Sequence, residues 1–270
     1  MNAKKLLVGV MIFSTMLAGR AIAAEPVAPV DPAQAKAQAM AIVDRMAGLL
    51  AGAKSLSVTM DTGFDAVQAS GQKIEFGEMR KIVADRPAHL LVEATSRDGK
   101  KSRVSFDGKD LTLYYEQSNV YASDPKAGTV DDAVKYFTED LGMRMPLAVM
   151  LSTKLKDFLD REVREAAFVE ESFIAGVACD HLALRGDHTD MQLWIAKGDQ
   201  PLPQRVVITY KELPERPQFW AQFSNWNLAP EVSDALFAFN PPQGAKKIPF
   251  SPRQVMPSGQ KDAKKEEVKP

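Results

Sequence analysis

Few residues of this chain combine into a recognisable catalytic or metal-binding set. The run Cys179-Asp180-His181 joins a thiol to an imidazole. Alternate side chains of a strand share a face, so Cys179 and His181 would lie on one face with Cα atoms roughly 6.6 Å apart. A thiolate–imidazole contact is awkward at that separation, and we favour a buried cysteine beside a surface histidine. An envelope hydrolase that uses both side chains is the alternative.

The other candidates for chemistry are weaker. Asp187-His188-Thr189-Asp190 offers metal-ligand types, but it lies where a hairpin turn is expected. The sequence has no Gly-x-Ser-x-Gly elbow, no Walker loop, no dinucleotide fingerprint and no His-Glu-x-x-His pair. Cys179 is the single cysteine, which excludes an intramolecular disulfide and a cysteine-based zinc cluster. We therefore expect no catalysis, no cofactor and no metal.

Composition excludes one class of partner. The chain of 270 residues carries 34 Lys and Arg against 35 Asp and Glu, and 45% of its residues are hydrophobic. That is an ordinary globular composition. The chain lacks the concentrated cluster of Lys and Arg that is typical of nucleic-acid-binding proteins.

The N-terminus predicts export. Lys4-Lys5 precedes a largely apolar stretch from Leu6 to Ala18, and Ala21-Ile22-Ala23 gives a small-x-small cleavage pattern. We expect residues 1–23 to be a signal peptide, with a retained membrane anchor as the alternative. No later apolar run reaches the ~18 residues that a membrane helix needs. The mature chain is therefore expected in the periplasm of a Gram-negative envelope, without a stable membrane anchor.

Outside its predicted strands, the mature chain contains a linker, two helical regions and a tail. Residues 24–30 contain two prolines and are predicted to be a linker. Asp31 caps a helix that Pro32 opens and Gly52 ends. Helical patterns return between Thr129 and Leu159, with Pro146 opening a second apolar piece. Residues 251–270 lack apolar periodicity and are predicted to be a disordered tail.

Two blocks of alternating residues flank the central helices. The first runs from about Ser55 to Tyr115 and is punctuated by Asp-Gly turns, and the second runs from about Val163 to Leu228. This order predicts an α+β, mainly β fold: a single strongly curved antiparallel sheet whose concave face the helices cover, over residues 31–250. Two small α+β domains are the alternative, but no central linker supports them.

Several motifs in succession resemble a known family. They are Phe106-Asp107-Gly108-Lys109, Pro201-Leu202-Pro203, Phe223-Ser224-Asn225-Trp226 and Phe237-Ala238-Phe239-Asn240-Pro241-Pro242. The sequence resembles the LolA/LolB-like superfamily of outer-membrane lipoprotein carriers, and within it the predicted periplasmic proteins of domain of unknown function 2092. The resemblance implies a half-barrel of about eleven strands with a helical lid over a cavity that, in the carriers, accepts acyl chains. Fold does not fix function, and no individual ligand residue is carried over.

The inward-facing apolar residues give the candidate ligand site. Alternation places Trp194, Trp220 and Trp226 on the opposite face. The predicted hydrophobic cavity is lined by Met60, Phe64, Phe76, Phe106, Leu113, Tyr115, Leu193, Ile208, Tyr210, Phe219 and Phe223.

The sequence therefore predicts a non-catalytic carrier for an acyl chain, lipid or lipoprotein, since each buried methylene contributes about 0.8 kcal/mol. The alternative is an interaction module for an envelope protein, with a filled core and no small ligand.

Overall fold

The computed structural model describes residues 31–140 and 145–250, and the long helix α1 (Pro32–Gly52) is its first element. The Asp31 carboxylate accepts a hydrogen bond from the backbone N–H of Ala33 over 3.3 Å, which satisfies one free donor of the first turn. The predicted helix is confirmed at both ends. The predicted signal peptide, linker and tail lie outside the described residues.

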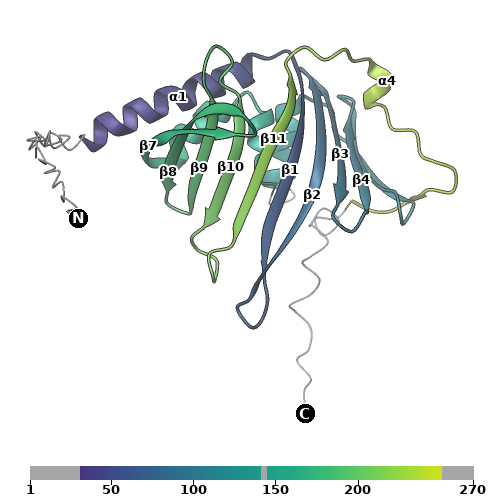
Figure 1. Cartoon of the computed structure of the whole chain (residues 1–270). Helices are drawn as coiled ribbons and strands as arrows, with labels where there is room; N and C mark the ends of the chain where they lie inside the picture. Colours follow the sequence, from purple (N-terminus) through teal and green to yellow (C-terminus); the bar gives the residue numbers. More distant parts are fainter. Residues whose placement is uncertain (1–30, 141–144, 251–270) are drawn as a thin grey trace, which may run out of the picture. The chain divides into compact units, whose positions relative to one another are not determined.

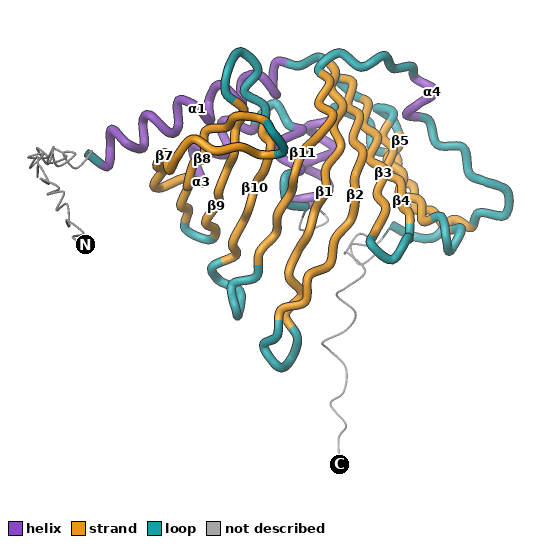
Figure 2. The backbone as a smooth tube through the Cα atoms, viewed as in Figure 1, coloured by secondary structure: helices purple, strands orange, loops and turns teal. Residues whose placement is uncertain are grey.

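One sheet contains all the strands of the described part. Its members are β1 (Ser55–Val67), β2 (Lys73–Asp85), β3 (His89–Ser96), β4 (Lys101–Phe106), β5 (Asp110–Tyr115), β6 (Val120–Pro125), β7 (Val163–Ile174), β8 (Val177–Gly186), β9 (Thr189–Ala196), β10 (Pro203–Tyr210), β11 (Gln218–Asn227) and β12 (Lys246–Lys247). Their order across the sheet is β12-β6-β5-β4-β3-β2-β1-β11-β10-β9-β8-β7. Figures 1 and 2 show the resulting curve, with the two blocks of strands meeting at the long β1–β11 pair.

The predicted antiparallel sheet is confirmed, with one local difference. β12 pairs with β6 in parallel, through Lys246 beside Val120 and Lys247 beside Tyr121. Two residues are too short a pattern to identify a strand from alternation. β12 nevertheless covers the outer edge of β6, which would otherwise expose unpaired backbone groups.

Short helices between β6 and β7 join α1 on the concave face of the sheet. They are α2 (Val130–Lys135), the π-helical turn η1 (Tyr136–Asp140), the 3-10 turn η2 (Ala148–Leu151) and α3 (Leu155–Glu162). Thr129 and Asp132 form a reciprocal capping box at the start of α2. Figure 1 shows these helices behind the sheet, on the side that α1 also occupies. The apolar faces of helices and strands form one buried cluster. None of the described helices is long and apolar enough to span a bilayer.

Arg86 holds α1 over the sheet. Its guanidinium donates to the backbone oxygens of Leu50 (3.1 Å) and Ala53 at the end of α1, and to that of Leu151 in η2 (2.8 Å). These carbonyls have no partner within their own helices, so a charged donor compensates the helix ends. Burial lowers the pKa of Arg86, while nearby Asp131 acts in the opposite direction.

The segment after β11 runs along the convex face and around the β6 edge. It contains the short helix α4 (Asp234–Phe237), whose buried Phe237 stacks on His89 with ring centroids 4.9 Å apart. Phe239 then packs against Tyr114 and Tyr121. At its end, Phe250 contacts the rings of Tyr136 and Phe137. We call residues 228–250 the strap, because they connect the convex face to the helices of the concave face.

Candidate functional site

A continuous apolar row crosses the concave face perpendicular to the strands. Strand registers place Phe76 beside Phe64, Phe64 beside Phe219, Phe219 beside Ile208, Ile208 beside Met191, and Met191 beside Leu184. These six residues belong to β2, β1, β11, β10, β9 and β8. Strands lie ~4.8 Å apart, so the row spans roughly 24 Å. The structure therefore places strands from before and after the central helices side by side, a pairing that the alternation of residues alone could not predict.

The eleven predicted ligand residues divide by burial into two groups. Seven lie in the buried core under the helices: Met60, Phe106, Leu113, Leu193, Ile208, Phe219 and Phe223. The other four are Phe64, Phe76, Tyr115 and Tyr210. Phe64, Tyr115 and Tyr210 are half-buried at the border of this core, and Phe76 is 37% exposed.

Phe64, Phe76 and Tyr210 lie toward one end of the concave face, which we call the hairpin end because it adjoins the β1–β2 and β10–β11 turns, whereas Tyr115 lies at the end of β5, in the row of Met60. Phe64 and Phe76 stack there with ring centroids 6.0 Å apart. Ile74, two register pairs nearer the β1–β2 turn and on the same face, is 40% exposed. Figure 1 shows that these two hairpins extend well beyond the helices. The apolar surface is thus covered over most of its length and accessible at this end.

An ion pair lies on the same face, four residues along β1 and β2 from the Phe64–Phe76 pair. Met60, Arg80, Ala94, Ser102 and Tyr115 form one row across β1 to β5. Because Met60 faces the core, Arg80 faces inward as well.

The charge of Arg80 is largely withdrawn from water. Its Nε donates to Glu78 over 2.6 Å, and the side chains of Arg80 and Glu78 are only 20% and 15% exposed. Burial, and secondarily Glu78, raises the pKa of Tyr115 to about 12. Sequence reasoning missed this pair, although a charged residue at an inward position of an alternating strand was a usable signal.

Two hollows of the described part lie elsewhere. One, of about 450 Å³, lies between α1 and the α3–β7 junction, next to Met40 and Val163. The other, of about 630 Å³, lies on the convex face between Arg103 and the strap residue Phe239. None of the eleven predicted residues lines either hollow.

Cys179 and His181 share one face of β8, as predicted, but they do not form a catalytic pair. The Cys179 thiol is buried and donates to the backbone oxygen of Val177 over 3.3 Å. Burial raises its pKa, which keeps it protonated and unreactive at neutral pH.

The expected surface position of His181 is wrong. Its side chain is only 12% exposed, because the imidazole stacks on the Trp194 ring with centroids 4.1 Å apart. The Nε2 atom of His181 lies 3.0 Å from Oε1 of Gln192.

The tryptophan prediction is correct for two residues and wrong for the third. Trp194 and Trp220 lie on the convex face, with the Arg205 guanidinium 5.9 and 5.3 Å from their ring centroids. Trp226 instead stacks on Phe223 and packs against the core. A bulge opposite Ser57 and Thr59, with Asn225 at φ 54°, shifts the alternation by one residue.

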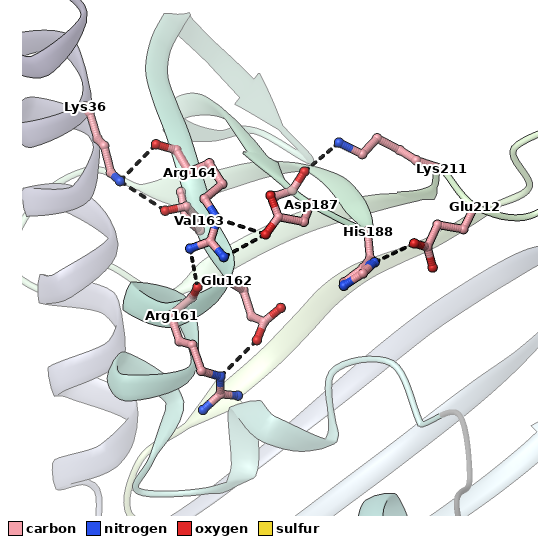
Figure 3. A network of polar contacts seen from close by, with 10 residues as sticks. Lys36, Arg161, Glu162, Val163, Arg164, Asp187, His188, Lys211 and Glu212 are labelled. Carbon is pink, nitrogen blue, oxygen red and sulfur yellow. Dashed lines mark hydrogen bonds and ion pairs between the residues drawn. The ribbon is translucent and has the colours of Figure 1, made fainter.

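The Asp187–Asp190 run forms the β8–β9 turn and the start of β9, as expected. Figure 3 shows it within a polar network at the end of the sheet. Arg164 contacts Asp187 at 2.6 Å, and His188 Nδ1 lies 2.7 Å from Glu212. The hydrogen bond to Glu212 raises the pKa of His188. Lys36 of α1 donates to the backbone oxygens of Val163 (3.0 Å) and Arg164 (2.9 Å), so the network ties α1 to β7.

Residues 39–251 match the profile of the family described as predicted periplasmic protein (DUF2092). The chain belongs to this family. Membership confirms the resemblance to the predicted periplasmic proteins of domain of unknown function 2092, and the protein is periplasmic.

Several solved structures are similar to this chain at low identity. An uncharacterised conserved protein from Thermus thermophilus is 13% identical, over 79% of this chain and 99% of that one, with a TM-score of 0.46. The lipoprotein LppX of Mycobacterium tuberculosis is 14% identical, over 73% and 99%, with a TM-score of 0.47. A LolA superfamily protein from Nitrosomonas europaea is 12% identical, over 74% and 97%, with a TM-score of 0.37.

No curated protein shows significant similarity to the chain. Because the three TM-scores are below 0.5, no function passes from these structures to this chain.

Proposed function

We propose that this periplasmic protein is a non-catalytic binding protein or carrier for a hydrophobic ligand with an acyl chain, such as a lipid or lipoprotein. The observation that supports this most is the apolar row from Phe76 to Leu184, which is accessible at its Phe76 end. A row of roughly 24 Å, from strands ~4.8 Å apart, suits an extended hydrocarbon chain. Each methylene removed from water contributes about 0.8 kcal/mol, so a long chain supplies a useful affinity.

In this proposal the ligand first contacts the less-buried aromatic residues Phe64, Phe76 and Tyr210 at the hairpin end. Phe64 and Phe76 offer ring faces, and the Arg80 guanidinium offers hydrogen-bond donors to an anionic or ester head group. The seven buried residues form the floor beneath the helices, and a ligand reaches them only when the helices move.

The alternative, an interaction module with a filled core, is favoured by the burial of those same seven residues.

A displacement assay separates the two functions. Dansyl-labelled undecanoic acid is titrated into the protein, and palmitate is added as competitor. We expect saturable fluorescence that palmitate displaces, and a loss of about tenfold in affinity in Phe76→Ser, which corresponds to about 1.4 kcal/mol. Phe173→Ser removes a ring that is 74% exposed on β7 and should leave the affinity unchanged. Absence of saturable uptake argues for the filled-core module, whereas saturable uptake with equal affinity in Phe76→Ser would show that the chain binds away from Phe76.

A further inference from the structure

The β7–β8 hairpin carries half of the large apolar side chains that are exposed in the described part of the chain. They are Phe168 (45% exposed), Val169 (49%), Phe173 (74%) and Val177 (38%). The other four lie on β1 and β2, far along the sheet order: Ile74 and Phe76 at the hairpin end of the concave face, and Val67 and Met79 at convex-face positions. Two separate apolar surfaces are therefore present, and the proposed acyl site accounts for only one of them.

β7 is also the last strand of the sheet. Its hydrogen-bonded neighbour is β8 on one side, and the sheet order ends there. α1 contacts the beginning of β7, where Lys36 occupies the carbonyls of Val163 and Arg164. Beyond this point, every residue from Ala167 to Glu171 is exposed. An edge strand of this kind offers unpaired backbone groups to another extended segment.

The charge of the hairpin selects the kind of segment. Strands β7 and β8 contain four acids (Glu165, Glu170, Glu171 and Asp180) and two arginines, Arg164 and Arg185, which both lie at the end of the hairpin away from its turn. Arg185 and Lys197 lie close to three of these acids and offset part of the charge. The side chain of Glu170 is 64% exposed and lies 3.9 Å from His181. A basic segment is attracted to this surface, and an acidic one is repelled.

A second copy of this chain is a poor occupant. The antiparallel pairing that places Phe168 opposite Phe173 of another β7 also places Glu170 opposite Glu171. Like charges directly opposite each other destabilise a strand pair. The bulge at Val169 further interrupts the regular edge that two long strands would need.

We infer that the free edge of β7 docks an extended segment of a partner polypeptide that alternates basic and apolar residues, with Phe168 and Phe173 as its apolar contacts. The main-chain groups of β7 supply hydrogen bonds, the two rings supply buried area, and Glu170 supplies charge selection. This surface is independent of the acyl site, so either one can be absent without the other.

The test uses the full chain and a fluorescently labelled, acetylated octapeptide of alternating lysine and valine. We expect saturable binding by fluorescence anisotropy, a loss of about tenfold in affinity in Phe173→Ser, and a similar loss in Glu170→Lys. Raising the salt from about 50 to about 500 mM should weaken binding severalfold. A glutamate–valine octapeptide should not bind, and Phe76→Ser should bind the lysine–valine peptide as the unaltered protein does.

Three results would overturn the inference. These are no saturable binding, equal binding of the glutamate–valine peptide, and a dimer in sedimentation that Phe173→Ser abolishes, which would make a second copy the occupant. Both variants alter exposed side chains, so their melting temperatures should match that of the unaltered protein. If one variant melts at a lower temperature than the unaltered protein, the peptide affinity of the other variant decides the test.

Discussion

Trp220 lies directly over Gly63 on the convex face: a Cβ added to Gly63 would be 2.5 Å from the indole Nε1 of Trp220. The two residues are register partners in β11 and β1, and Gly77 of β2 is the next residue in the row. The indole Nε1 donates to Glu75 over 3.0 Å. A glycine in the middle of a strand, which costs stability on its own, is here required by a ring that lies over Gly63 and reaches Glu75 of β2.

Gly63→Ala is therefore expected to destabilise the protein. Trp220 would have to move away from Gly63, which costs about 1–3 kcal/mol by comparison with other overpacked sites. Gly48→Ala is the matched control, because Gly48 lies in α1 with open space around its Cβ position. Alanine is the better helix former there, so that variant should gain up to about 1 kcal/mol. Urea unfolding measures both free energies. Equal effects of the two substitutions would contradict the close packing of Trp220.

Arg86→Met is expected to cost about 3 kcal/mol, since it leaves the carbonyls of Leu50, Ala53 and Leu151 without their charged donor. The control is Arg97→Met, which removes an exposed ion pair with Asp61 and should cost less than about 1 kcal/mol. Chemical denaturation followed by circular dichroism gives the two free energies. A loss in Arg86→Met no larger than in Arg97→Met would show that α1 is held by apolar packing alone.

His188 should titrate above the usual range of histidine, because its hydrogen bond to Glu212 favours the charged form. A pKa raised on folding means that the pair stabilises the protein fully below about pH 6.5, and that this contribution is lost as the pH rises through the folded pKa.

NMR titration of the ring protons measures this pKa directly. Glu212→Gln should bring the pKa of His188 down, whereas Glu215→Gln, in the same β10–β11 turn, should leave it unchanged. An unaltered titration in Glu212→Gln would contradict the contact.

Much of this fold could be predicted from the sequence, because local rules determine most of it. The Asp31 cap and the alternation in β9 and β10 identify their elements directly. Trp226 could not be placed, since a bulge depends on the partner strand and shifts the alternation by one residue. β12 is too short to leave a pattern.

The candidate site, like the fold, could be predicted from the sequence only in part. The inward apolar residues follow from alternation, but their burial under α1 to α3 depends on packing that the pattern does not contain. The apolar row depends on registers between strands far apart in the sequence, such as Phe64 beside Phe219. Arg80 at an inward position could have been noticed, and its partner Glu78 two residues away lies on the same face.

The most direct test of the acyl-binding proposal is native mass spectrometry of the protein purified from envelope extract and, in parallel, of the same preparation after incubation with palmitate. The proposal predicts a lipid-sized mass adduct on the unaltered protein that Phe76→Ser loses and Phe173→Ser keeps. A bare polypeptide mass in both preparations of the unaltered protein would contradict it.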